Sequence, residues 1–221
     1  MANEVAFYIL ISCFGAIGLL HLYFCFAEKE GPRRLSKCLC LALLLSAFAC
    51  GFPAYWLIAV GLGFGLLGDY FLINKRREWS LVAGIFAFLA NHFCFIAFMI
   101  ISSGLADVLG YAIPLGVLLV GLTIYPIVLK IVKKWGLSIG VAVYTATLLG
   151  ELAMTILLAV EHSGSWYLLA VAGSLSFIAS DATLGFTLFV KDVKRRDFYI
   201  MLTYLLGQAL LCSGMALGML I

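Results

Sequence analysis

The chain has 221 residues, of which 65% are hydrophobic and 11% are charged, and its formal net charge at pH 7 is +3. Its mean hydropathy of +1.15 is far above the range of soluble globular domains. The composition excludes a soluble fold, because such a fold cannot hide so much apolar surface, and it is typical of a protein that crosses a membrane several times.

Charged or turn-rich segments divide the chain into eight apolar runs, each close to the roughly 20 residues that a helix needs to cross about 30 Å of hydrocarbon. The first run is too long for a signal-peptide core and has no basic segment before it, so we expect it to be a membrane helix. The sequence predicts an all-α, polytopic membrane protein with eight transmembrane helices in one bundle, forming a single domain over residues 1–221. The expected spans are residues 5–27, 35–51, 54–74, 80–102, 108–130, 136–160, 166–190 and 198–220.

The seven cysteines form no CxxC pair and lie within or beside apolar runs. We interpret them as small hydrophobic residues rather than as a disulfide framework or a zinc site. The chain also has no phosphate-binding loop, EF-hand or HExxH pattern. We therefore expect neither a cofactor nor a metal ion.

All fourteen Lys and Arg residues are expected in alternate connections between the spans. By the positive-inside rule these connections are cytoplasmic, which places both termini on the non-cytoplasmic side and requires an even number of spans. Topology and anionic lipid explain the basic residues, so the net charge indicates no nucleic acid partner. The host membrane is a bacterial cell membrane or the endoplasmic reticulum, and the oligomeric state is open. The basic residues are Lys29, Arg33, Arg34 and Lys37; Lys75, Arg76 and Arg77; Lys130, Lys133 and Lys134; and Lys191, Lys194, Arg195 and Arg196.

Three acids lie inside predicted spans: Asp69, Glu151 and Asp181. A charged Asp near the centre of a membrane helix costs about 2.5 to 3.5 kcal/mol, so such residues usually face a protein interior or a wet cavity. Counting residues from the helix ends, with a rise of about 1.5 Å each, places Asp69 and Asp181 at a similar depth in the cytoplasmic half. The other polar residues in the spans are His21, His92, Asn91, Tyr144, Tyr204 and Gln208, and Ser180 precedes Asp181.

The chain resembles the YhhN family of membrane lysoplasmalogenases over most of its length. Four blocks in the same order carry the resemblance: the run that ends at Gly68-Asp69, residues 87–95 with Asn91-His92, residues 173–184 with Ser180-Asp181, and residues 203–208 with Tyr204 and Gln208. The resemblance implies hydrolysis of the vinyl ether bond of a lysoplasmalogen, a lysophospholipid substrate, to a fatty aldehyde and glycerophospho-ethanolamine or -choline.

Vinyl ether hydrolysis needs a proton donor and a negative group that stabilises the resulting cation, much as two carboxylates share the work in glycoside hydrolysis. We therefore expect Asp69 and Asp181 to be the catalytic pair, with either residue in either role. His92 is expected to orient a carboxylate or a water molecule, with Asn91, Ser180, Tyr144 and Glu151 as supporting residues. Tyr204 and Gln208 are expected to hold the glycerol oxygens. The headgroup phosphate is expected near Lys75, Arg76, Arg77 or Lys191.

Each site residue also has a purely structural interpretation. Asp69 is close enough to the membrane surface to pair with Arg76 or Arg77, and His21 is read as a helix-end residue. Glu151 and Tyr144 are either partners in interhelical hydrogen bonds or part of the cavity lining.

Two other functions stay open at this stage. A small proton-coupled transporter would also need intramembrane acids. A metal-dependent intramembrane lipid hydrolase would need several histidines at one depth, and only His21 and His92 lie within the spans.

Overall fold

The computed structural model of the protein describes residues 2–74, 77–103, 106–133, 135–162 and 166–219. In this part of the chain, eight α-helices are long and apolar enough to cross a membrane. The all-helical fold and the number of spans, eight, are as the sequence predicted. The elements are α1 (Ala2–Phe26), α2 (Glu30–Gly51), a short 3-10 turn (Pro53–Tyr55), α3 (Trp56–Leu72), α4 (Glu78–Ser102), α5 (Ala106–Val132), α6 (Trp135–Glu161), α7 (Tyr167–Phe189) and α8 (Arg196–Gly218).

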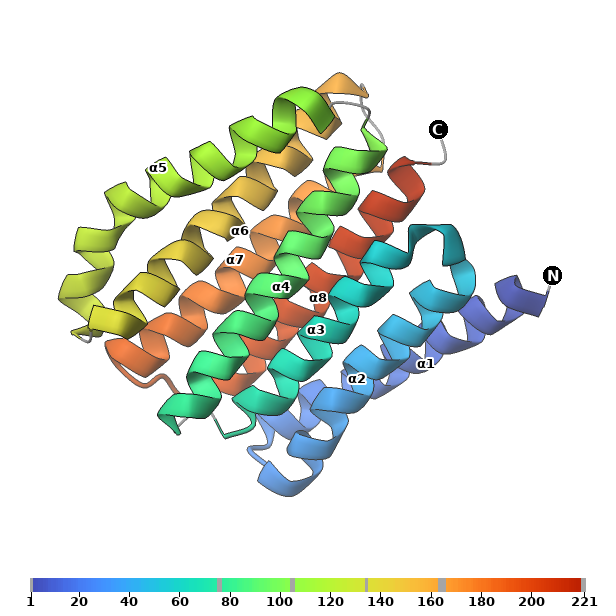
Figure 1. Ribbon diagram of the computed structural model, residues 1–221. Helices are drawn as coiled ribbons and strands as arrows, with labels where there is room; N and C mark the ends of the chain where they lie inside the picture. The colour runs from blue at the N-terminus through green and yellow to red at the C-terminus, as the bar shows by residue number, and fades with distance from the viewer. Residues whose placement is uncertain (1, 75–76, 104–105, 134, 163–165, 220–221) are drawn as a thin grey trace.

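Successive helices run in opposite directions, so α1 begins and α8 ends at the same end of the bundle (Figure 1). Helices α1, α3, α5 and α7 end at the opposite end of the bundle, which we call the basic end because the Lys and Arg residues that the structure describes lie there. Helices α3 and α4 pack together, as do α7 and α8, whereas α5 packs chiefly on α6 and touches α4 only slightly. Helix α5 therefore forms an outer edge of the bundle (Figure 1).

Helix α2 begins at Glu30, whereas the sequence predicted residue 35. Pro32 lies in its first turn, where a proline fits because the backbone N–H groups of that turn have no partner within the helix. The prediction that Arg33, Arg34 and Lys37 lie in a connection is therefore wrong, since all three are on α2. Lys130 and Arg196 are likewise helical, on α5 and α8. Lys37, which also falls within the predicted span 35–51, is therefore well inside the helix rather than near its start.

Glycines allow α7 and α8 to approach until their backbones touch. A Cβ atom added at Gly207 on α8 would lie 2.9 Å from the backbone nitrogen of Phe177 on α7, and one added at Gly173 would meet the backbone of Leu211. Small residues commonly permit this close packing between membrane helices, where lipid supplies no hydrophobic drive for association. This contact fixes the helix that carries Asp181 against the helix that carries Tyr204.

The Gly207→Ala substitution is expected to destabilise the protein by about 1 to 3 kcal/mol, because the added methyl group must push two backbones apart. Thermal unfolding in detergent, followed by tryptophan fluorescence or by loss of the monodisperse fraction, measures the effect. Gly15→Ala is the matched control, since a Cβ at Gly15 meets nothing within 4 Å. Equal unfolding temperatures for the two variants would contradict this account of the α7–α8 contact.

Candidate active site

Two aspartates from distant parts of the chain line one cavity at the basic end. The cavity has a volume of about 330 Å³ and is walled by α1, α2, α3, α4, α7 and α8. Asp69 on α3 is almost completely buried, with 1% of its surface exposed, and Asp181 on α7 is half-buried. The fold thus brings both candidate catalytic carboxylates to the same polar space.

Asp69 is held by two partners from other helices. The Nζ atom of Lys37 on α2 lies 3.1 Å from Oδ1, and the hydroxyl of Tyr204 on α8 donates a hydrogen bond of 2.9 Å to Oδ2. The ammonium favours the carboxylate form of Asp69 and offsets part of the cost of burying it. Asp69 is not paired with Arg77 in the structure, and Arg76 lies outside the described residues.

Lys37 was not among the predicted site residues. It was counted with the basic residues of a connection, although it falls within the predicted span 35–51, and in the structure it lies on α2 with 17% of its side chain exposed. Its contact with Asp69 depends on how α2 and α3 pack against each other, which the sequence pattern does not give.

Asp181 is held by Tyr144 on α6, whose hydroxyl donates a short hydrogen bond to Oδ2. No ion pair involves Asp181 in the part of the chain that the structure describes. The neighbouring Ser180 also lines the cavity, and its hydroxyl donates a hydrogen bond of 3.0 Å to the carbonyl of Ile200 on α8. Each aspartate therefore accepts a hydrogen bond from a tyrosine of another helix, but Asp69 alone of the two has a lysine beside it within the described residues.

A second space adjoins the polar cavity. It is a groove of about 370 Å³ between α4, α5, α6 and α7, lined almost entirely by apolar side chains, and we call it the apolar groove. Four residues border both spaces: Leu72, Phe88, Asp181 and Leu184. Asp181 is the acid among these four, so its carboxyl group stands at the boundary between a polar and an apolar compartment.

The remaining predicted site residues form a deeper layer. His92 Nδ1 lies 2.7 Å from Glu151 Oε2, and the side-chain nitrogen of Gln208 donates a hydrogen bond of 3.2 Å to the Asn91 oxygen. All four side chains are fully buried, and none belongs to the lining of the polar cavity or the apolar groove. The His92 ring packs edge to face on Phe177, with 4.5 Å between ring centres. The structure thus joins His92 to Glu151 and ties four helices together below the cavity.

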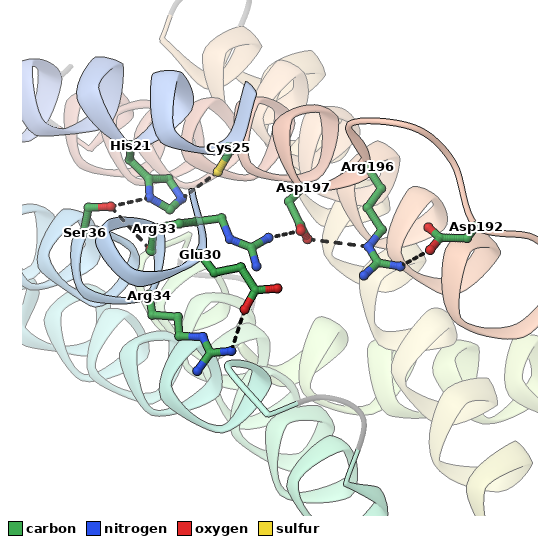
Figure 2. A network of polar contacts seen from close by, with 9 residues as sticks. All are labelled: His21, Cys25, Glu30, Arg33, Arg34, Ser36, Asp192, Arg196 and Asp197. Carbon is green, nitrogen blue, oxygen red and sulfur yellow. Dashed lines mark hydrogen bonds and ion pairs between the residues drawn. The ribbon is translucent and has the colours of Figure 1, made fainter. Parts of the chain in front are cut away.

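Basic side chains surround the mouth of the cavity, and most of them are paired. Arg33 pairs with Asp197, Arg34 with Glu30 at 2.9 Å, and Arg196 with Asp192 at 2.6 Å, as Figure 2 shows. Arg33 and Arg196 both lie against Asp197, so one network links α2 to the start of α8. These arginines belong to the cavity lining.

Of the four residues predicted to hold the headgroup phosphate, Arg77 lines the cavity and its side chain is exposed. Lys75 and Arg76 lie outside the described residues. Lys191 is exposed on the surface, and it does not belong to the cavity lining. The basic residues of α2, which were predicted only to mark the cytoplasmic side of the membrane, are closer to the cavity than Lys191 is.

His21 lies in the cavity wall rather than at a solvated helix end. Its Nδ1 atom is 2.7 Å from the hydroxyl of Ser36 on α2, and its Nε2 atom is 3.4 Å from the sulfur of Cys25 (Figure 2). The contact with Ser36 ties α1 to α2, whereas the contact with Cys25 lies within α1. Among the described residues, no group of three or more His, Cys, Asp and Glu side chains is arranged to hold a metal ion.

The fold and the site define a multi-pass integral membrane protein with an acidic site enclosed between its helices. The model of the YhhN family matches residues 32–215, and the chain belongs to this family, as its four sequence blocks indicated. It is 34% identical over 189 residues to the lysoplasmalogenase TMEM86A of Bos taurus, and the aligned region covers 80% of this chain and 75% of the relative. No solved structure matches the chain.

The Glu151→Ala substitution is expected to destabilise the fold by about 3 kcal/mol, because it removes one partner of a buried pair and leaves the other facing the interior. The double variant His92→Phe and Glu151→Leu is expected to lose less than the sum of the two single changes. Thermal unfolding in detergent measures Glu151→Ala, the two single variants His92→Phe and Glu151→Leu, and the double variant. Glu161→Ala, at the exposed end of the same helix, is the control and should unfold like the unmodified protein.

Proposed function

We propose that the protein is a lysoplasmalogenase, which hydrolyses the vinyl ether bond of lysoplasmenyl-ethanolamine or -choline. The observation that carries the proposal is the pair of aspartates on one polar cavity in a member of the YhhN family. The name of the bovine relative, a lysoplasmalogenase that is 34% identical, supports the same activity.

Hydrolysis of a vinyl ether requires one proton donor and one negative group that stabilises the cation. A carboxylic acid protonates the vinyl carbon that is not bonded to oxygen, and the electron pair of the double bond forms the new C–H bond, which leaves an oxocarbenium ion. Water adds to the cationic carbon and gives its proton to the carboxylate that has just formed. The hemiacetal then collapses: its hydroxyl group gives up its proton and becomes the carbonyl of the aldehyde, the C–O bond to glycerol breaks, and the glycerol oxygen receives the proton that the hydroxyl group has lost.

We assign the acid to Asp181 and the anion to Asp69. The ammonium of Lys37 at 3.1 Å favours a charged Asp69, which stabilises the oxocarbenium ion in a space of low dielectric constant. Asp181 has no ion pair within the described residues, and it borders both compartments, where the polar and apolar halves of a lipid would join. The two carboxyl groups thus divide the work in the manner of the acid and the stabilising carboxylate of a glycosidase.

The supporting residues have positioning roles. Tyr144 and Tyr204 orient Asp181 and Asp69 through their hydroxyl groups, and Ser180 ties α7 to α8 beside Asp181. The deeper layer of Asn91, His92, Glu151 and Gln208 keeps the helices in register beneath the cavity.

The headgroup phosphate belongs at the basic end, near Arg77 and the exposed Arg34. Lys75, Arg76 and Lys191 are further candidates by sequence. By the positive-inside rule the basic end faces the cytoplasm and the termini lie on the other side. The lysophospholipid then comes from the inner leaflet. Its phosphate remains at the membrane surface while its ether oxygen reaches the aspartates.

Asp69→Asn and Asp181→Asn are each expected to reduce kcat by roughly 100-fold or more, since each removes a group that acts on the reacting atoms. Release of long-chain aldehyde from purified protein in detergent measures the rate, and an ester lysophospholipid should yield no product. Full activity in both variants would overturn the assignment of the pair. Uptake of a solute into proteoliposomes without any aldehyde would favour a transporter instead.

Lys37→Met is expected to lower kcat by about 10-fold to 100-fold and to change KM little, because Lys37 acts through the charge of Asp69 and does not contact the lipid. Lys37→Arg should recover part of the rate, since it restores a cation at this position. Lys29→Met is the matched control, because Lys29 is exposed at the same end and lies outside the cavity lining. A Lys37→Met protein with normal kcat would remove Lys37 from the site.

A further inference from the structure

The apolar groove has a lining that differs sharply from that of the polar cavity beside it. Apart from Thr145, Tyr144 and Asp181, its side chains are hydrocarbon, and they include Val128, Ile131 and Val132 from the last turns of α5. On the facing side are residues of α4, α6 and α7, with Phe88 and Leu184 shared between the two spaces. Such a pairing of compartments matches an amphiphile with one polar half and one hydrocarbon half.

The groove exists because α5 stands away from α4. Helix α5 packs chiefly on α6, and its contact with α4 is slight, so the side chains of α4 and α7 that face it border an open groove. Several side chains at the rim of the groove are exposed, among them Ile131, Phe186 and Val190. In a membrane these side chains face lipid, and the groove opens sideways into the bilayer at the depth of the aspartates.

We propose that the apolar groove is the lateral entrance for the lipid substrate and the binding site of its alkenyl chain, with the first carbons of the chain at Asp181. This inference rests on the proposed function, since it takes the chain of a lysoplasmenyl lipid as the occupant. Continuity of the groove with the polar cavity supports that occupant, because a bound molecule must be apolar in one space and ionic in the other.

The groove contributes to the orientation of the lipid chain and adds little to the free energy of binding. A hydrocarbon chain that moves from the bilayer into the groove leaves one apolar environment for another, so it gains little of the free energy that burial from water would give. What the groove adds is direction, because it holds the vinyl carbons against the acid in a reactive geometry. Blocking it should therefore lower turnover of long chains far more than turnover of short ones.

Gly185 offers a clean way to block the groove. It lies one helical turn beyond Asp181 on α7 and lines the groove, and a Cβ atom at this position would meet nothing within 4 Å. Gly185→Leu and Gly185→Phe therefore extend into the groove without disturbing helix packing. Gly63→Leu on α3 is the matched control, since a Cβ at Gly63 also meets nothing within 4 Å and Gly63 lines neither the groove nor the cavity.

The expected result is that Gly185→Phe lowers kcat/KM for a hexadecenyl lysoplasmalogen by about 10-fold or more and for a hexenyl analogue by less than about twofold. Gly185→Leu should give a smaller loss of the same kind, and Gly63→Leu should behave like the unmodified protein with both substrates. An unchanged ratio between the two substrates in Gly185→Phe would overturn the inference.

A second measurement separates this inference from the proposed function. A lysophospholipid with a saturated ether chain and a mid-chain diazirine is hydrolysis-resistant, and on illumination it labels whatever lines its binding site. Labelling on the α4, α5, α6 and α7 segments of the groove, reduced in Gly185→Phe, is the expected result even if no aldehyde is ever released. Labelling spread over the outer faces of α1 and α3 would overturn the groove as the binding site. An unlabelled ether lipid in excess should suppress the specific adducts.

Discussion

The ion pair between Lys37 and Asp69 is the contact on which the site depends. It joins two helices at a place where neither charge could remain alone, because an isolated buried charge costs several kcal/mol even after relaxation. The ammonium fixes α2 against α3, and the carboxylate in turn receives Tyr204 from α8. Three helices are thus positioned by one charge pair, and the polar cavity is the space that remains between them and α7.

The spans and the two aspartates were within reach of sequence reasoning, because both follow from hydropathy and from the cost of a charge in lipid. The pairing of particular side chains could not be predicted from the sequence. Lys37 has the sequence pattern of a topological cation near the end of a span, and only the packing of α2 on α3 places it beside Asp69. His92 was expected to orient a carboxylate or a water molecule, but the sequence did not indicate that its partner is Glu151, 59 residues away on a helix that periodicity alone cannot orient. Contacts between helices depend on rotation and tilt, which local patterns leave undetermined.

The apolar groove lay beyond sequence reasoning for a related reason. Val128, Ile131 and Val132 read as ordinary lipid-facing residues of a membrane helix, and nothing in their pattern tells that α5 stands apart from α4. A hydrophobic residue gives the same sequence signal whether it faces lipid or a groove, since both surroundings are apolar. The polar cavity could be inferred from the sequence because charged residues within a membrane span are costly and therefore conspicuous. The apolar groove has no corresponding signal.

The backbone contact between α7 and α8 has a mechanical consequence. Where Gly173 and Gly207 let two helices touch along their main chains, the pair resists bending and sliding, and so Ser180 keeps its bond to Ile200. Helix α5 rests mainly on one neighbour and can swing outward at a far smaller cost in broken contacts. The bundle therefore combines a rigid helix pair, which holds Asp181 and Tyr204, with an outer helix that has few contacts to break.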